Sequence, residues 1–310
     1  MGEPRVATGL TAVEPDPSVV SIGFFDGVHR GHQSIIARAV RSAQERGLRS
    51  VVVTFDRHPM EVVNPGSQPR MLMTLQRRAR TLSDQGVDLV VVLPFDDALR
   101  HLEPAEFVDR VLVEPLRARK VVVGSNFRFG HRAAGDVPLL NDLGPQREFD
   151  VEGVTLLSLD GEPISSTEIR AAVDVGDVEK AERLLGRPHI LDGFVVRGDA
   201  RGATLGFPTA NLQVSDRLAI PARGIYAGCC HLEDDTLVPC VTSIGVNPTF
   251  GGQELRVESY LLDFEGDLYG RSIAVDFRHR LRDEQRFDSA EGLIAAIHAD
   301  VARARELLGT

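Results

Sequence analysis

The distribution of hydrophobic residues divides the chain into two parts with different patterns. Up to about residue 186, continuous apolar runs rich in β-branched residues alternate with stretches of helical spacing. Strands that are buried on both faces give continuous rather than alternating runs, so we predict five such strands. They cover residues 19–24, 50–55, 87–93, 120–124 and 154–159. Strands that alternate with helices predict a doubly wound parallel sheet, whose ligands bind at the carboxyl ends of the strands.

The helices of this first part are marked by apolar residues three and four positions apart. The clearest helix begins after Gly31 and ends near Gly47, which suits a C-cap. Residues 104–116 repeat the pattern. Residues 166–188 are predicted to form two short helices that are separated at Gly176.

The second part, from residue 190 to about residue 280, has short runs in which apolar and polar residues alternate. Gly, Pro, Asn and Asp separate these runs, a spacing that is typical of a small antiparallel β-barrel. A last helix over residues 289–308 is apolar on one side, and we expect it to pack across the barrel. We therefore predict an α/β domain over residues 1–186 and a barrel domain over residues 187–310.

Composition and charge narrow the possible functions. The 310 residues, of which 43% are hydrophobic and 26% charged, are enough for two globular cores. The net charge of −10 provides no global basic field for nucleic acid or anionic lipid, so an anionic ligand must be held by a local site. The sequence begins without a signal-peptide pattern, and its longest apolar run, residues 89–95, is too short to span a membrane. We expect a cytoplasmic protein without nucleic-acid or membrane partners.

The three cysteines do not indicate a disulfide framework. Cys229 and Cys230 are adjacent and would point to opposite faces of a strand, and Cys240 leaves the number odd. A four-cysteine zinc site is excluded by the same count. We expect reduced cysteines in strands.

Two histidines lie three residues apart in GFFDGVHRGHQ, residues 23–33, where a predicted strand passes into a predicted helix. Three glycines would let the backbone approach a ligand closely, and the start of the helix offers unpaired N–H groups. Such a segment favours an anion, and the imidazoles could donate hydrogen bonds to phosphoryl oxygens. The candidate ligand-binding residues are Gly23, Phe24, Asp26, Gly27, His29, Gly31 and His32.

The spacing of the two histidines also allows a metal pair or a pair that only caps a turn. A metal would need a third ligand, and no neighbouring cluster has a familiar zinc spacing. The chain contains neither GxxxxGK[ST] nor GxGxxG, so a phosphate site would be of another type.

A second polar element follows in ISSTEIR, residues 164–170. Ser165, Ser166 and Thr167 are typical N-cap residues, and Arg170 follows within the first turns of the predicted helix. Capping would account for one of the three hydroxyls. The cluster therefore indicates a second phosphate-facing element.

The barrel part opens with a glycine-rich segment, GDARGATLGFPTANL, residues 198–212. Its main-chain N–H groups could fold over phosphates, although the segment could also be a plain turn. In an extended chain Thr209 and Asn211 point to the same side, and their oxygens suit Mg²⁺ bound with a nucleotide. The candidate residues are Gly198, Gly202, Gly206, Pro208, Thr209 and Asn211.

A carboxylate lies in the middle of RVESYLLDF, residues 256–264. Strand alternation puts Glu258 on the opposite face from Val257 and Ser259, and we expect apolar neighbours around it. A carboxylate at such a position is either a solvated strand residue or a positioned general base.

Several of these segments together resemble the bifunctional bacterial riboflavin kinase/FAD synthetase family. HRGH is similar to the motif of HxGH nucleotidyltransferases, and GFPTAN is shared with riboflavin kinases. The resemblance extends over nearly the full chain. It is carried by GFFDGVHRGHQ, VTFDRHP (53–59), VVGSNFRFGHRAAGD (122–136), ISSTEIR, GFPTAN and VESYLLDF.

This resemblance implies two ATP-dependent reactions. The barrel would phosphorylate riboflavin to FMN with release of ADP, and the α/β domain would adenylylate FMN to FAD with release of pyrophosphate. Both steps would need Mg²⁺. The expected fold is a nucleotidyltransferase sheet joined to a riboflavin kinase barrel with a terminal helix.

The family pattern also implies roles for individual residues. In the first part His29 and His32 would bind the ATP phosphates, with Asn126 beside them. In the second part Glu258 would take the proton from the ribityl 5′-hydroxyl. The other matched positions are Ser165, Ser166, Thr167 and Arg170 closing over the triphosphate, Thr209 and Asn211 on Mg²⁺, and Asn247 as a turn former in the loop beside the flavin.

The chain departs from the family pattern at three positions. Arg57 stands where Pro is usual, which puts the role of its loop in doubt, and Ser125 stands where an acidic residue is common. Ala203 replaces a residue that is often basic, and Arg201 could compensate for it.

Two other functions remain open at this point. An HxGH nucleotidyltransferase could act on another acceptor, such as a pantetheine or nicotinate phosphate, beside an unrelated barrel. A non-catalytic flavin carrier or sensor would bind flavin without consuming ATP. GFPTAN together with Glu258 argues against the first function, and the presence of Glu258, His29 and His32 argues against the second.

Overall fold

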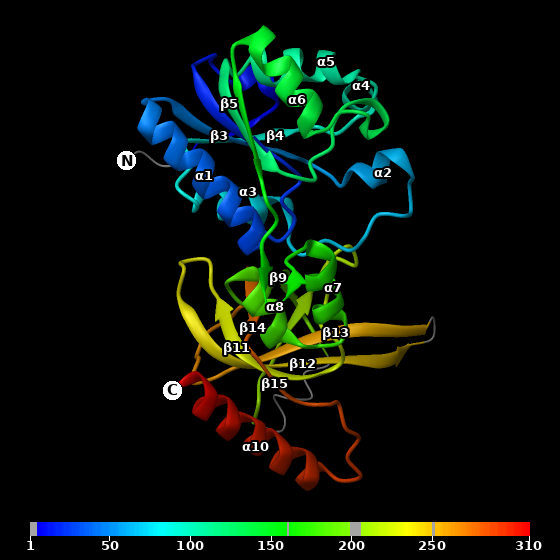
Figure 1. Cartoon of the computed structure of the whole chain (residues 1–310). Helices are drawn as coiled ribbons and strands as arrows, with labels where there is room; N and C mark the ends of the chain where they lie inside the picture. The colour runs from blue at the N-terminus through cyan, green and yellow to red at the C-terminus, as the bar shows by residue number, and fades with distance from the viewer. Residues whose placement is uncertain (1–4, 160, 199–205, 250–251) are drawn as a thin grey trace. The chain divides into compact units, whose positions relative to one another are not determined.

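The computed structural model describes residues 5–159, 161–198, 206–249 and 252–310, and only the backbone of 247–249 and 252–254 (Figure 1). The chain divides into two compact units. The first unit comprises Met1–Pro69 and Thr74–Ser165, and the second comprises Arg70–Met73 and Ser166–Thr310. The division of function at residues 186 and 187 remains a prediction.

The first unit is built on a six-stranded sheet in which every pair of neighbours is parallel. The strand order is β1-β4-β3-β2-β5-β6. The order reverses at β2, which lies between β3 and β5, and ligands of doubly wound sheets bind at the carboxyl ends of the strands at such a point. The strands are β1 (Arg5–Thr8), β2 (Ser18–Ile22), β3 (Arg49–Phe55), β4 (Leu89–Leu93), β5 (Ala118–Gly124) and β6 (Asp150–Val154).

Helices cover both faces of this sheet, which confirms the doubly wound fold (Figure 1). On one face α1 (Arg30–Arg46) packs against Val19, Val122 and Val154. The other face is covered by α5 (Pro104–Phe107), the π-helical segment η2 (Val108–Val113) and α6 (Val137–Leu143). The remaining segments are η1 (Leu10–Ala12), α2 (Pro59–Val63), α3 (Leu75–Ser83), α4 (Asp97–Arg100), η3 (His131–Ala133), η4 (Gly144–Arg147) and the hairpin β7 (Ser158–Leu159) with β8 (Glu162–Pro163).

The predicted strand over residues 154–159 is wrong. The last strand of the sheet is β6, which ends at Val154. This edge strand is largely polar, and Glu152 forms ion pairs with Lys120 at 2.6 Å and Arg38 at 2.8 Å. An edge strand does not need the continuous apolar run of an interior strand, so the pattern missed both β6 and the other edge strand, β1.

The second unit contains an antiparallel barrel that six strands close in the order β12-β13-β10-β9-β14-β11, with β11 paired to β12. The seventh strand, β15, pairs with β11. The strands are β9 (His189–Val196), β10 (Ala210–Gln213), β11 (Gly224–His231), β12 (Leu237–Thr249), β13 (Gly252–Leu261), β14 (Ser272–Phe277) and β15 (His279–Arg282). The expected barrel is confirmed.

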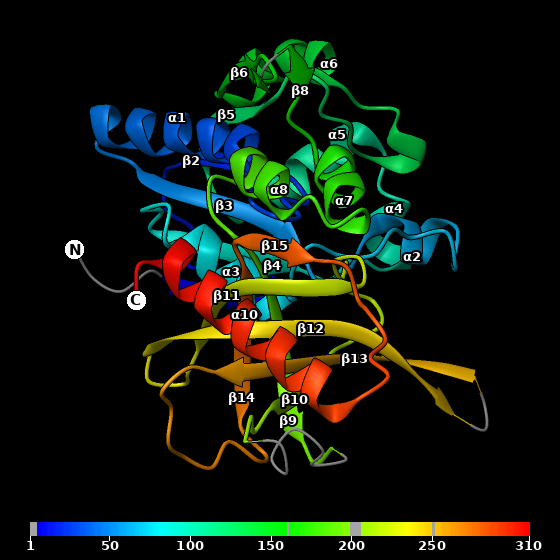
Figure 2. The same cartoon turned by 90° about the horizontal axis from the view of Figure 1, so that it is seen from below.

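Among the described residues, three helices accompany the barrel. The predicted pair is α7 (Ser166–Asp174) and α8 (Val178–Leu185), and Gly176 between them has a φ of 76°. The terminal helix α10 (Ala290–Leu308) lies across β11 and β12, as expected (Figure 2). Its last turns pack through Ala304 and Leu308, whereas the apolar side chains of its first half are half-exposed.

The three cysteines are free thiols in the strands of the barrel, as expected. Burial raises the pKa of Cys230 to about 12 and raises the pKa of Cys240 well above its usual value. These thiols are therefore protonated at neutral pH and pack as small apolar side chains.

His189 at the start of β9 predicts a pH dependence of stability. Its ring is 1% exposed, and its Nε2 lies 2.8 Å from the Ala219 carbonyl oxygen, to which the neutral imidazole donates. Burial lowers its pKa to about 4. The unfolded chain therefore takes up a proton near pH 6.5, whereas the folded chain does so only near pH 4. Stability contributed by neutral His189 is therefore complete above pH 6.5 and is lost as the pH falls toward 4.

We expect this loss to reach about 3 kcal/mol by pH 4. His189→Gln keeps a donor for Ala219 but cannot titrate, so its stability should fall less over the same range. Calorimetric unfolding of both proteins between pH 4.5 and 7 measures the difference. Parallel curves for the two proteins would contradict the assignment.

Candidate active sites

The loop between β2 and α1 has a strained backbone. Three of its residues have positive φ: Phe25 at 56°, Gly27 at 81° and Val28 at 40°. For Phe25 and Val28 such conformations cost on the order of 1–3 kcal/mol each and persist only where the surroundings hold them. The contacts that hold this loop include the Thr54 hydroxyl, which donates to the Phe24 carbonyl at 2.9 Å. Strain of this kind is concentrated at functional sites.

His29 and His32 lie together at the start of α1. His29 is the N-cap, and its Nδ1 accepts the His32 backbone N–H at 3.3 Å. The two rings are stacked, with centroids 3.5 Å apart and planes 20° from parallel. Since Nδ1 of neutral His29 is an acceptor, its proton is on Nε2. Burial lowers the pKa of His32 well below its usual value, and His29 lowers it further.

This geometry separates the three interpretations of the histidine pair. The capping role is real for His29, but Nδ1 of His32 is buried and has no hydrogen-bond partner among the described residues. Stacked rings hold their lone pairs in nearly parallel planes, which does not suit a shared metal ion. Over the described part of the chain, no three His, Cys, Asp or Glu side chains are grouped as metal ligands. The open nitrogen and the helix N-terminus favour an anion.

Beneath this loop lies a charged side chain that the motifs did not include. Arg78 of α3 is 2% exposed, and its guanidinium carbon is 4.3 Å from the centroid of the Phe24 ring. The buried carboxylate of Asp26 interacts electrostatically with it. The sequence could have indicated Arg78, because this arginine lies with Ala79 and Leu82 on the helix face where apolar side chains are expected.

The other predicted residues of the first unit follow the same sheet edge. Gly23 donates its N–H to the Val53 carbonyl at 3.1 Å, and Asn126 follows the end of β5 with an exposed side chain. A Cβ on Gly31 would lie 3.1 Å from the His29 ring and 3.7 Å from the Ile164 carbonyl oxygen. Gly31 is therefore at the point where the histidine helix meets the chain leading to Ser165.

The hydroxyl cluster does not belong to one unit. Ser165 ends the first unit, whereas Ser166, Thr167 and Arg170 begin α7 in the second unit. Within the second unit, Arg170 Nε donates to the Arg70 carbonyl at 2.7 Å. The closing of this cluster over the histidines stays a prediction.

Two of the three residues that depart from the family pattern, Arg57 and Ser125, lie on the surface. The exposed Arg57 side chain pairs with Asp56, with its Nη2 2.8 Å from the carboxylate. Ser125 is exposed, and its N–H donates to the Val154 carbonyl at 2.8 Å. Ala203 and Arg201 lie outside the described residues, as does Gly202.

In the second unit Glu258 lies on the outer face of the barrel. The predicted alternation is confirmed, since Val257 and Ser259 are buried inside. Its expected apolar neighbours are wrong: Asn211 of β10 and Ser243 of β12 stand directly opposite Glu258 in the register of the two neighbouring strands. On the same strand, Nη1 of Arg256 is 3.8 Å from a Glu258 oxygen. Polar neighbours suit a carboxylate that faces a polar ligand.

Asn211 is packed closely against Gly198. A Cβ on Gly198 would overlap the Asn211 amide, so only glycine leaves room for this side chain. Both residues line a cavity of about 700 Å³ that also includes Arg197 and Arg256. Thr209, in contrast, lines a separate cavity of about 150 Å³ with apolar side chains that include Leu261. Within the described residues, Thr209 and Asn211 are only two positions apart along the chain but open into different cavities.

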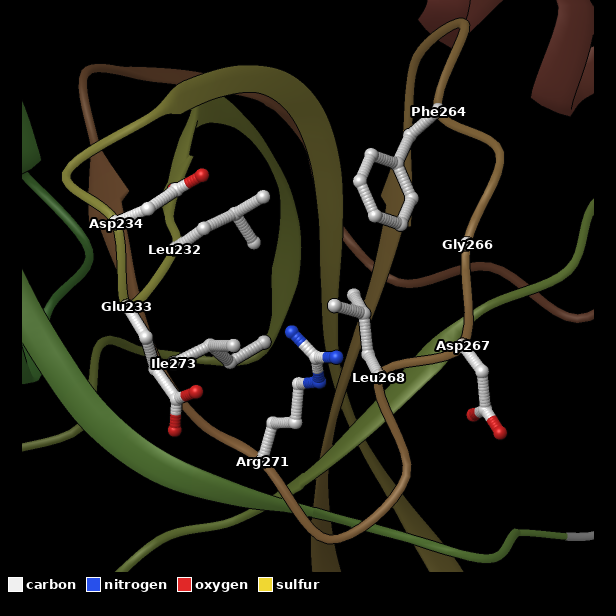
Figure 3. Close-up of a pocket in the computed structure, with 9 residues that line it drawn as sticks. All are labelled: Leu232, Glu233, Asp234, Phe264, Gly266, Asp267, Leu268, Arg271 and Ile273. Atoms are coloured by element: carbon white, nitrogen blue, oxygen red, sulfur yellow. The ribbon is translucent and has the colours of Figure 1, made fainter.

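The connection between β13 and β14 forms a wall of the Thr209 cavity and of one further cavity of about 470 Å³. Phe264 and Leu268 contribute to both. Figure 3 shows the Arg271 side chain extending into the further cavity between Ile273 and Leu268. This connection therefore gives the Thr209 cavity an apolar wall.

The remaining predicted residues of the second unit lie around these cavities or outside the described residues. Gly206 and Pro208 are exposed, and Gly206 has a φ of 88°. Asn247, expected in a turn, is instead paired with Glu254 in the β12–β13 ladder, because β12 continues to Thr249. The Asn247 side chain is outside the described residues.

The two units match two family models. The FAD synthetase model matches residues 12–168, and the riboflavin kinase model matches residues 185–308. A parallel-sheet nucleotidyltransferase joined to a kinase barrel defines a class of two-domain, ATP-dependent transferases. Among the residues that the structure describes, no helix has the length and apolar character needed to cross a membrane.

Curated relatives agree with this class over almost their full length. A bifunctional riboflavin kinase/FMN adenylyltransferase from Pseudomonas fluorescens is 44% identical over 98% of this chain and 97% of its own. The corresponding proteins of Escherichia coli K12 and Bacillus subtilis are 37% and 33% identical. They cover 97% and 94% of this chain, and 96% and 92% of their own lengths are matched. The chain belongs to the bifunctional riboflavin kinase/FMN adenylyltransferase family.

A solved structure from Streptococcus pneumoniae, described as a macrolide-efflux protein, shares the fold with a TM-score of 0.88. It is 32% identical, and the match covers 98% of this chain and 99% of that one. The enzyme described here uses ATP in both of its activities, and riboflavin, FMN and FAD are its flavin substrates and products.

Proposed function

We propose that His29 and His32 serve adenylyl transfer and that Asn211 and Glu258 serve riboflavin phosphorylation. The observation that carries this proposal is the membership of the two sets in different compact units. His29 and His32 lie at a helix start in the first unit, and Asn211 faces Glu258 across a strand pair in the second.

In adenylyl transfer, a phosphate oxygen of FMN attacks the α-phosphorus of ATP, and pyrophosphate leaves. His29 Nε2–H and the N–H groups that begin α1 donate to the phosphate oxygens as negative charge moves onto the leaving group. His32 is neutral in the free protein, and its buried Nδ1 has no hydrogen-bond partner among the described residues. Asn126, Ser165, Ser166, Thr167 and Arg170 complete this site in the proposal.

In riboflavin phosphorylation, Glu258 accepts the proton of the ribityl 5′-hydroxyl as that oxygen attacks the γ-phosphorus of ATP and ADP leaves. Asn211, which stands directly opposite Glu258, holds the phosphate end of the nucleotide beside this carboxylate. The cavity that contains Thr209 and Leu261 would receive the nucleotide base. Gly198, Gly202, Gly206 and Pro208 form the loop over the phosphates, and Asn247 belongs to the flavin side.

The side-chain oxygen of Asn211 is a neutral hard ligand that suits Mg²⁺, which takes few protein ligands when phosphates and waters supply the rest. Thr209 carries a second oxygen of this kind but opens into a separate cavity, so in the proposal Asn211 is the main protein ligand. Bound there with ATP, Mg²⁺ would neutralise phosphate charge. The tight contact of Gly198 with Asn211 keeps the amide at the edge of the cavity.

Incubation with riboflavin, ATP and Mg²⁺ tests this function, with FMN, FAD, ADP and pyrophosphate followed over time. We expect FMN and ADP to appear before FAD and pyrophosphate. EDTA should stop both steps, and added Mg²⁺ should restore them. Tight flavin binding without ATP consumption would instead identify a flavin carrier. Transfer of the adenylyl group to pantetheine phosphate or nicotinate phosphate would identify a different adenylyltransferase.

The cytoplasmic location and the absence of nucleic-acid and membrane partners remain predictions.

A further inference from the structure

The buried arginine of the first unit has no place in the two reactions described above. Arg78 is among the largest fully buried side chains of the described residues. It lies in α3 beside Ala79 and Leu82, at a position where a helix normally presents an apolar side chain. A buried guanidinium is costly unless it is paired and hydrogen-bonded, so its partners indicate what it does.

The partners of Arg78 belong to the carboxyl ends of two neighbouring strands. The guanidinium lies over the Phe24 ring, 4.3 Å from its centroid, just beyond the end of β2. Its Nη2 donates to the Phe55 carbonyl at the end of β3. The carboxylates of Asp26 and Asp56 interact with its charge. The arginine therefore joins the end of β3 to the first residues of the loop that leads to His29.

Phe24 is held from a second side as well. The His58 ring meets it edge to face, with centroids 4.8 Å apart and planes at 80°. Arg78 over one part of this ring and His58 at another leave Phe24 little freedom. Since Phe25 and Val28 follow with positive φ, the loop cannot relax without moving Phe24 or Asp26.

We propose that Arg78 is a positioning residue for adenylyl transfer, whose guanidinium fixes Phe24 and Asp26 and so sets where the loop delivers His29 and His32. The inference rests on the proposed function of these two histidines. Arg78 itself is buried beneath Phe24 and does not touch substrate.

Arg78→Met and Arg78→Lys test the proposal. Methionine keeps much of the length without charge or hydrogen bonds, and lysine restores the charge. A shift of the histidines of about 1 Å would lower kcat for FAD formation by about 100-fold. The KM values for ATP and FMN should change by less than about threefold, because contacts to the ground-state substrates are not removed. Arg78→Lys should recover only part of the lost activity, since it returns the buried charge near Asp26 but not the planar group over Phe24.

Two controls separate positioning from folding. Arg80→Met removes an exposed arginine of the same helix and should leave FAD formation unchanged. Riboflavin phosphorylation, measured on the same Arg78→Met preparation, should also be unchanged because it belongs to the second unit. If Arg78→Met does not fold, Arg78→Lys and Phe24→Leu are combined. Their effects on kcat should be less than additive, since both break the same contact.

The inference is overturned if Arg78→Met keeps kcat within threefold of the unmodified enzyme, or if KM rises while kcat is preserved. Strict additivity of Arg78→Lys with Phe24→Leu would overturn it as well. A fully active variant that lacks both histidines would remove the proposed function on which it rests. If the variant that lacks both histidines forms no FAD while Arg78→Met is fully active, the proposed function stands and only the inference about Arg78 is overturned.

Discussion

Glu258→Gln should abolish the formation of FMN from riboflavin while the enzyme continues to convert supplied FMN to FAD. The amide cannot accept the proton of the ribityl hydroxyl, and loss of a general base lowers kcat by about 100- to 10,000-fold. The substitution is nearly isosteric, and Glu258 is on the outer face of the barrel, so the fold should be retained. Chromatography of the flavins after incubation with riboflavin or with FMN measures the two activities separately.

Glu265→Gln is the matched control for this experiment. Glu265 is an exposed carboxylate of the same unit in the connection that follows β13, and its removal changes the net charge by the same amount. Both activities should survive in this variant. If Glu258→Gln lost FMN formation and FAD formation together, the assignment of Glu258 to one reaction would be wrong.

The double substitution His29→Ala with His32→Ala should have the opposite effect. It removes the donors proposed for the developing charge on the phosphates, and a loss of about 100- to 1,000-fold in kcat for FAD formation is expected. It also removes the N-cap of α1, which costs about 1 kcal/mol. Riboflavin should still become FMN, which accumulates because the next step fails.

His32→Ala alone separates the loss of a phosphate-binding side chain from the loss of the helix cap, because it leaves the cap made by His29 in place. His101→Ala, an exposed histidine of the same unit, is the matched control and should retain both activities. Initial rates of pyrophosphate release with FMN and ATP provide the measurement. Normal FAD formation by the double variant would rule out the phosphate role of these histidines.

The strands that could be predicted from the sequence are those whose side chains meet the same kind of surroundings along the whole strand. β2 and β4 are buried along their whole length, so their continuous apolar runs were sufficient. The barrel strands β9 and β10 alternate over part of their length because one face meets the core and the other is more exposed. β6 was missed because its partners are charged side chains, and a polar run contains no evidence of the lysine and arginine that pair with it.

The candidate sites were predictable only where the chemistry is local in sequence. His29 and His32 are three residues apart, so one turn of helix brings them together. Arg78 meets Phe24 across 54 positions of sequence, and no local pattern indicates that contact. The cavity of Thr209 depends in the same way on a distant segment, the connection that follows β13, which does not line the cavity of Asn211.

The central claim is that one chain carries two active sites that work independently. The most direct measurement mixes the Glu258→Gln protein with the His29→Ala/His32→Ala protein and supplies riboflavin, ATP and Mg²⁺. Each protein alone should form no FAD from riboflavin. The mixture should form FAD, because the second protein releases FMN and the first adenylylates it. A mixture that accumulates FMN without FAD, or leaves riboflavin unchanged, would contradict the claim.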